Sequence, residues 1–197
     1  DDRMMTLAVA KAILKKFEYI KQEEATFDAH LLSKLTVEAM QEIGRKYPNR
    51  GYGGMFSRWL RSDDPKPYNS FGNGAAMRIS PIAYATDSEE ELIRYSEAVT
   101  SVTHNQPEGL KGAEATALAI FLARQKVSKT EIKRIISAQY YPLDFSLAEI
   151  RKTYRFDPTC QGTVPQAIVA FLEATSFEDA LRNAISLGGD SDTLAAI

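Results

Sequence analysis

The stretch FEDALRNAISLGGDSDTLAAI (Phe177–Ile197) changes character at a pair of glycines. Before them, apolar residues recur at the spacing of one face of an α-helix, at Phe177, Ala180, Leu181, Ala184 and Ile185. After Gly188 and Gly189, two aspartates precede a second apolar run. The sequence therefore predicts a helix, a tight turn and a second helix with an acidic first turn. The simplest interpretation is that Asp190 caps this second helix and Asp192 faces the positive end of its dipole.

The same helical spacing recurs elsewhere in the chain. It is found at Leu92, Tyr95, Val99 and Val102, and again at Leu7, Ala10, Leu14 and Phe17. Helix starts are predicted at Asp28 and at three capping boxes, Ser88 with Glu91, Ser128 with Glu131 and Ser146 with Glu149. Alternating segments typical of strands do not recur at regular spacing. We therefore predict an all-α fold of roughly eight to ten helices.

The composition is that of a soluble globular protein. The chain has 197 residues, of which 44% are hydrophobic and 25% charged, enough for one domain with a sizeable core. Its 24 basic residues nearly balance 26 acidic ones, so we expect no nucleic-acid partner and no membrane surface. The single cysteine, Cys160, excludes an internal disulfide framework and fits a reducing compartment. We expect it to be a small buried residue.

Two long irregular stretches interrupt the helical pattern, at 47–74 and 140–165. Both are rich in glycine, proline and aromatic residues. Long loops inside a compact domain are usually functional or disordered, and the aromatic content argues against disorder. We therefore predict that these two stretches carry part of a functional site.

Acidic residues stand at two distant helix starts. Asp1 and Asp2 precede the amphipathic run that begins at Thr6, as Asp190 and Asp192 precede theirs. If the two starts converge, carboxylates about 4 Å apart would repel by roughly 4 kcal/mol per pair at an effective dielectric near 20. Such a cluster needs protonation or cations, and oxygen ligands favour Mg²⁺, Ca²⁺ or Mn²⁺. The sequence leaves convergence and simple capping as alternatives.

The segment NSFGNGAAMRISPIA (Asn69–Ala83) is a second candidate site. Gly72 and Gly74 flank Asn73 where an apolar helix is expected, which suits either an anion-binding turn or an ordinary glycine turn. Arg78 lies one turn further on, where it could neutralise a phosphate or bond a carboxylate. His104 follows the predicted helix from Ser88, where it either complements the helix dipole or donates to a substrate oxygen.

Five segments, taken in order, resemble the ADP-ribosylglycohydrolase family over essentially the whole chain. They are DDRMMTLAVA, GNGAAMRISPIA, VTHNQPEGLKGAEA, GTVPQAIVAFLEA and GGDSDTLAAI. The resemblance implies a compact, single-domain orthogonal bundle over residues 1–197. This domain would lack the family's N-terminal helix and the end of its C-terminal helix.

The resemblance also implies a set of site residues. Two Mg²⁺ ions, with Mn²⁺ as the alternative, would be held by Asp1, Asp2, Asp190, Asp192 and Thr193. Asp2, Asp190 and Asp192 would be catalytic. ADP-ribose would contact Ser70, Phe71, Gly72, Asn73, Gly74 and His104, with the diphosphate on the glycine segment and Phe71 near the adenosine. Arg3 stands where the family usually has Thr or Ser, and Ser70 stands where arginine-specific members have Asp.

The activity implied is hydrolysis of the glycosidic bond between ADP-ribose and an acceptor side chain. The expected substrate is an ADP-ribosylated protein or a small ADP-ribose conjugate, and the expected protein is a cytoplasmic monomer. A non-catalytic protein that binds ADP-ribose or a related nucleotide on the same scaffold is the alternative. A third interpretation is a purely structural helical domain whose acidic helix starts are caps.

Overall fold

The computed structural model describes residues 2–23 and 28–197. These residues form eleven α-helices and one 3-10 helix, which in chain order are α1 (Asp2–Glu23), α2 (Ala29–Lys46), α3 (Gly54–Arg61), η1 (Asn73–Ala75), α4 (Ser80–Ala85), α5 (Glu89–Thr100), α6 (Pro107–Arg124), α7 (Lys129–Gln139), α8 (Leu147–Ile150), α9 (Cys160–Glu173), α10 (Phe177–Ser186) and α11 (Ser191–Ala196). Their only extended pairing is an isolated antiparallel bridge between Gly72 and Thr159. The prediction of an all-α fold is confirmed.

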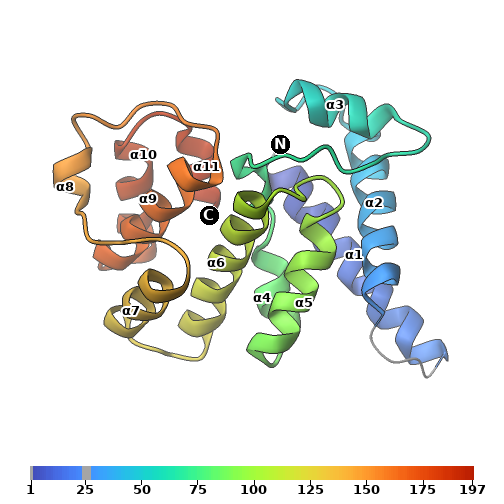
Figure 1. Cartoon of the computed structure of the whole chain (residues 1–197), viewed down its shortest axis with the longest axis horizontal. Helices are drawn as coiled ribbons and strands as arrows, with labels where there is room; N and C mark the ends of the chain where they lie inside the picture. The colour runs from blue at the N-terminus through green and yellow to red at the C-terminus, as the bar shows by residue number, and fades with distance from the viewer. Residues whose placement is uncertain (1, 24–27) are drawn as a thin grey trace.

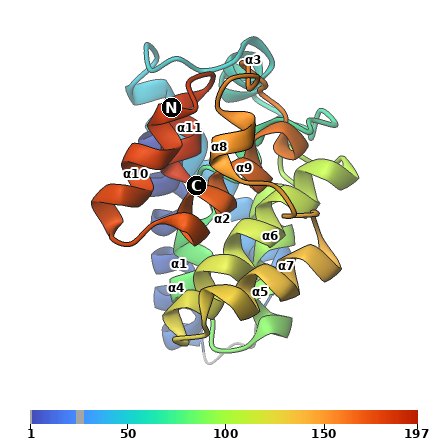
Figure 2. The same cartoon turned by 90° about the vertical axis from the view of Figure 1, so that its left-hand side faces the viewer.

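Helix α6 runs through the middle of the molecule (Figure 1). Helices α1, α2 and α5 lie on one side of it, and α7, α9 and α10 lie on the other. The start of α1 lies beside α11 in both views (Figures 1 and 2), and the two helices are in contact. The fold therefore brings the two ends of the described chain to one place. Within the described ranges, no helix is both long and apolar enough to cross a membrane.

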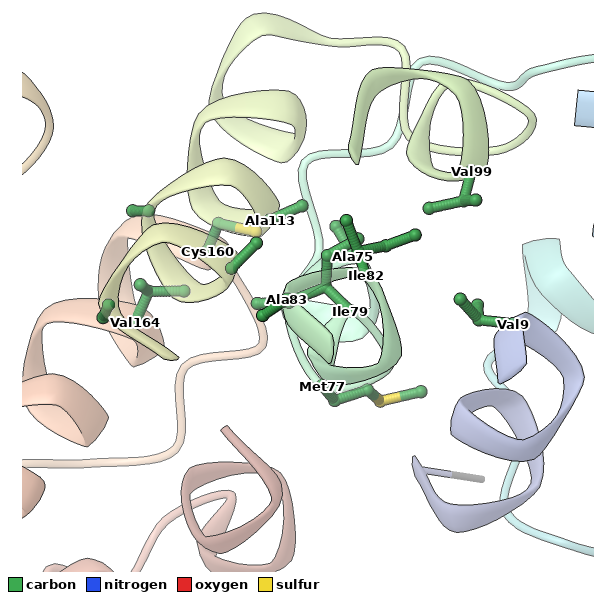
Figure 3. Packing of buried hydrophobic residues seen from close by; sticks show 14 of the residues in the cluster. Val9, Ala75, Met77, Ile79, Ile82, Ala83, Val99, Ala113, Cys160 and Val164 are labelled. Carbon is green, nitrogen blue, oxygen red and sulfur yellow. The ribbon is translucent and has the colours of Figure 1, made fainter. Parts of the chain in front are cut away.

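The segment from η1 to α4 fills the centre of the core. Ala75, Met77, Ile79, Ile82 and Ala83 are all buried there (Figure 3). Their neighbours in the same cluster come from four surrounding helices and are Val9, Val99, Ala113, Cys160 and Val164. This central position explains why a glycine-rich turn at residues 72–74 is held firmly although it is not part of a long helix.

Helix starts follow the predicted caps closely. Ser88, Ser128 and Ser146 each accept a hydrogen bond from the backbone N–H three residues later. Of the three, only Ser146 forms the complete reciprocal box. Glu91 reaches back to the N–H of Asp87 instead of that of Ser88, and Glu131 accepts hydrogen bonds from Arg134. The helix count exceeds the expected upper bound by one. Both predicted irregular stretches contain a short helix, α3 in the first and α8 in the second.

The apolar face was predicted correctly for α5, in part for α10, where Ala184 is buried, and not for α1. Leu92, Tyr95 and Val99 are buried as expected, whereas Leu14 is 64% and Phe177 is 82% exposed. Helix α1 is apolar on two sides, and the side that the fold buries carries Met5, Ala8, Val9 and Ala12. Periodicity identifies a helix, but it does not choose between two apolar faces.

Candidate functional site

Asp190 occupies the N-cap position of α11, yet its side chain makes no capping hydrogen bond. The chain reaches it through Gly188 and Gly189, whose φ angles of 71° and 65° suit glycine. Asp190 Oδ2 instead accepts a hydrogen bond of 2.6 Å from the side-chain amide of Asn73. The capping interpretation is therefore wrong for Asp190, because its carboxylate is directed to a distant part of the chain.

The two acidic helix starts meet. Asp2 lies in the first turn of α1, and its Oδ1 accepts a hydrogen bond of 2.9 Å from the hydroxyl of Thr193 in α11. Burial raises the pKa of the Asp190 carboxyl, and the negative charges of Asp192 and Asp2 raise it further, against the opposing hydrogen bond from Asn73. Asp2, Asp190, Asp192 and Thr193 therefore form one acidic cluster. Asp1, the remaining predicted member, lies outside the described residues.

The acidic cluster offers oxygen donors only, from three carboxylates and a hydroxyl. Burial is the largest cause of the raised pKa of Asp190, and the charges of Asp192 and Asp2 add a repulsion that a divalent cation would relieve. Oxygen donors of this kind suit a hard cation such as Mg²⁺ or Mn²⁺. Over residues 2–23 and 28–197, however, no three acidic, histidine or cysteine side chains are arranged closely enough to be a ready-made metal site. The fit to a divalent cation therefore lies in the chemistry of the donor atoms.

The glycine segment is a 3-10 turn, not the α-helix start expected from the sequence. Several of its backbone N–H groups are already used within the protein. The N–H of Gly72 bonds Ser70 Oγ at 3.2 Å, that of Asn73 bonds the carbonyl of Pro158 at 2.8 Å, and that of Ala75 bonds the carbonyl of Gly72 at 3.2 Å. Ser70 is buried, while Phe71 is exposed on the surface beside the turn.

The second irregular stretch holds the glycine segment in place. The N–H of Cys160 donates to the carbonyl of Phe71 at 2.9 Å, next to the Gly72–Thr159 bridge. The Asn73 amide also donates to the Thr163 hydroxyl at 3.1 Å, and that hydroxyl donates to the carbonyl of Asp157 at 2.9 Å. The sequence analysis missed Thr163 and Asp157. The only signal in the sequence was the GTVPQAI segment, which does not indicate that Thr163 contacts Asn73.

His104 lies four residues beyond the end of α5, buried against the glycine segment. A Cβ atom added at Gly74 would stand 3.4 Å from His104 Nε2, and one at Gly72 would stand 3.6 Å from it. Burial, and secondarily the charge of Arg78, hold the pKa of His104 well below its usual value, so the ring is neutral. His104 and the glycine segment, which the resemblance assigns to one ligand, are therefore neighbours in the fold. Arg3 is exposed to solvent.

Comparison with known proteins identifies the family of this chain. The model of the ADP-ribosylglycohydrolase family matches residues 1–197. The chain is similar to the ADP-ribosylhydrolase ARH3 of Mus musculus, with 30% identity over 145 residues that cover 66% of this chain and 36% of the mouse protein. It is also similar to the ADP-ribosylarginine hydrolase Tri1 of Pseudomonas putida (strain GB-1), with 26% identity over an alignment of 208 residues that covers 100% of this chain and 55% of Tri1.

A solved structure shares the fold. The structure described as "ADP-ribosylglycohydrolase-related protein complex" aligns with a TM-score of 0.65 at 23% identity, covering 100% of this chain and 67% of that chain. The chain thus spans only part of the length of the proteins that it matches. Because the family model matches from the first residue to the last, this chain belongs to the ADP-ribosylglycohydrolase family.

Proposed function

We propose that this chain carries the site of a Mg²⁺-dependent ADP-ribosyl hydrolase. The observation that carries the proposal is the position of Asp190. Its carboxylate makes no capping hydrogen bond, has a raised pKa and lies with Asp192 and Asp2. The proposed reaction is hydrolysis of the bond between the terminal ribose C1 and an acceptor atom, which consumes water and releases ADP-ribose and the free acceptor.

The proposed substrate is an ADP-ribosylated protein or a small ADP-ribose conjugate. Its diphosphate would lie against the turn of residues 70–74, beside His104. The neutral ring of His104 would act there as a hydrogen-bond donor and not as a cation. The exposed ring of Phe71 would stack on the adenosine half. The names of the relatives support this substrate class, since both are hydrolases of ADP-ribosylated groups.

The acidic cluster would act at the scissile bond. Departure of the acceptor builds positive charge on the ribose carbon, and a nearby anionic cluster stabilises that charge. The Asp190 carboxylate, held in place by the Asn73 amide, would accept a proton from the attacking water. A Mg²⁺ ion held by Asp2, Asp190, Asp192 and Thr193 would supply Lewis-acid stabilisation at the ribose hydroxyls.

Replacing Asp192 tests the proposal. We expect Asp192→Asn to lower the release of ADP-ribose from an ADP-ribosylated protein by at least about a hundredfold, the scale on which loss of one electrostatic group acts. Helical content measured by circular dichroism should not change. The matched control is Asp87→Asn, which removes an exposed carboxylate at the opposite end of α5 from His104.

The same preparation separates the hydrolase from the non-catalytic alternative. Wild-type protein that releases ADP-ribose with Mg²⁺ but not with EDTA supports the proposal. Wild-type protein that binds ADP-ribose by calorimetry but never releases it from a modified protein supports a nucleotide-binding role instead. Near-normal turnover in Asp192→Asn would contradict the role given to the acidic cluster.

A further inference from the structure

Arg78 is a buried cation that has no acidic partner among the described residues. It lies between η1 and α4 and is only 1% exposed. In the described part of the chain, no carboxylate forms an ion pair with it, and its Nε is buried without a hydrogen-bond partner. Its Nη2 donates to the Thr103 hydroxyl at 2.6 Å and lies 3.4 Å from His104 Nδ1. The guanidinium is therefore only partly compensated.

Such an arrangement needs a reason, because a buried charge without a partner is costly. Burial lowers the pKa of Arg78 to about 10, and no carboxylate offsets that effect. The side chain remains positively charged at neutral pH. An interior apolar residue of similar size would avoid the cost. The positive charge is therefore best explained by a negative charge that arrives from outside the chain.

The hydrogen bonds around Arg78 lead directly to the glycine segment. Thr103 Oγ1 accepts from Arg78, so its own proton is free to point at His104 Nδ1, which is 2.7 Å away. With Nδ1 accepting, the proton of the neutral ring lies on Nε2. Nε2 is the atom that faces Gly72 and Gly74. Arg78 thereby fixes the tautomer that presents an N–H donor to the turn.

We propose that Arg78 is a positioning residue that makes the 70–74 turn selective for an anionic diphosphate. It acts in two ways, through its own charge across a poorly screened interior and through the Thr103–His104 relay that orients a neutral donor. The inference rests on the proposed function for the identity of the ligand, but the selectivity for anions follows from the described residues alone. A guanidinium suits this role because it keeps its charge when buried, unlike an amine.

The test compares charged and neutral ligands on Arg78→Met. The control Arg61→Met changes the net charge equally but removes an exposed cation at the end of α3. Calorimetry would give the dissociation constants of ADP-ribose and adenosine with Mg²⁺, and of inorganic pyrophosphate in EDTA. We expect Arg78→Met to weaken ADP-ribose and pyrophosphate at least tenfold and to leave adenosine within about twofold. Its Tm without ligand should equal or exceed that of wild type.

Each other outcome has a defined meaning. Equal weakening of adenosine and ADP-ribose, or unchanged pyrophosphate binding in Arg78→Met, would overturn the inference. If Arg78→Met fails to fold, Thr103→Val serves in its place, since it keeps the cation but cuts the relay. The expected result for Thr103→Val is a smaller loss that is again confined to the anionic ligands, and equal loss for adenosine would overturn the inference.

The proposed function and this inference can fail separately. Wild-type protein that hydrolyses its substrate while Arg78→Met binds ADP-ribose normally would refute only the role of Arg78. Wild-type protein that binds pyrophosphate through Arg78 but neither binds nor releases ADP-ribose would refute only the hydrolase proposal.

Discussion

Helices α10 and α11 both begin with acidic residues, but the two starts are built differently. At α10, Ser176 Oγ accepts from the N–H of Asp179 at 3.1 Å, and Asp179 Oδ2 accepts from the N–H of Thr175 at 2.8 Å. At α11, the Asp190 side chain makes no capping hydrogen bond, and its Oδ2 instead accepts from Asn73. The hydrogen bonds from Thr175 lower the pKa of Asp179, whereas burial and neighbouring charge raise that of Asp190. The first start stabilises its helix, and the second holds its carboxylate for another use.

Exchanging these roles by mutation should have opposite effects at the two starts. We expect Asp190→Asn to lower ADP-ribose release by at least about a hundredfold without lowering Tm, because no cap is lost. We expect Ser176→Ala to lower Tm by about 2–4 °C, since losing a cap costs about 1 kcal/mol, and to leave activity unchanged. Thermal melts and the hydrolysis assay measure both. A drop in Tm for Asp190→Asn comparable to that of Ser176→Ala would remove the distinction.

The glycine pair that delivers Asp190 gives a smaller effect with its own internal control. A Cβ at Gly189 would lie 2.8 Å from Tyr154 Cε1, whereas one at Gly188 would meet nothing within 4 Å. Both residues have positive φ, so each alanine costs about 1–2 kcal/mol of backbone strain. Only Gly189→Ala adds a steric clash. Chemical denaturation should therefore show Gly189→Ala to be the less stable variant, and equal stability would mean that Tyr154 moves aside freely.

The pH dependence of stability should differ in sign between the two starts. The lowered pKa of Asp179 stabilises the fold above the unfolded value near 3.8, and this contribution is lost as pH falls through the folded pKa. The raised pKa of Asp190 destabilises the fold at neutral pH, and this burden lifts as pH falls through its folded pKa. In EDTA, Asp190→Asn should therefore have a higher Tm than wild type at pH 7. This difference in Tm should narrow as pH falls through the folded pKa and close near the unfolded value of 3.8.

The matching variant Asp179→Asn should fall below wild type at pH 7, and its deficit should close only below about pH 3.8. Melting curves from pH 3 to pH 7 measure both variants. Tm differences of the same sign for the two variants at pH 7 would contradict the contrast drawn between the two helix starts.

The sequence predicted the parts of the molecule that depend on neighbours in the chain. Such parts are the serine caps of three helices and the buried face of α5. Both depend on residues three or four apart, whose contacts follow from helical spacing. The capping residues are Ser88, Ser128 and Ser146. The convergence of Asp2 with Asp190 and Asp192 was only one of two alternatives until the resemblance favoured it. Local pattern does not determine contacts across the whole chain.

The parts of the site that the sequence did not predict depend on such distant contacts. Thr163, which was not predicted, acts through Asn73, 90 residues away. Arg78 was a candidate, but its contact with Thr103, 25 residues away, was not predicted. Neither residue type is distinctive, since buried threonines usually bond a nearby carbonyl and arginines usually pair with acids. Arg78 is notable because no described carboxylate forms an ion pair with it, which only the fold shows.

The hydrogen bond between Thr193 and Asp2 joins residues 191 positions apart. A ribosome adds Thr193 only after Asp2 and all the helices between them. The acidic cluster is therefore complete only once α11 has been synthesised, after η1 and α4. A growing chain that stops before α11 lacks half of the cluster, Asp192 and Thr193. Occupancy of this cluster by a ligand would thus report that translation has passed α11.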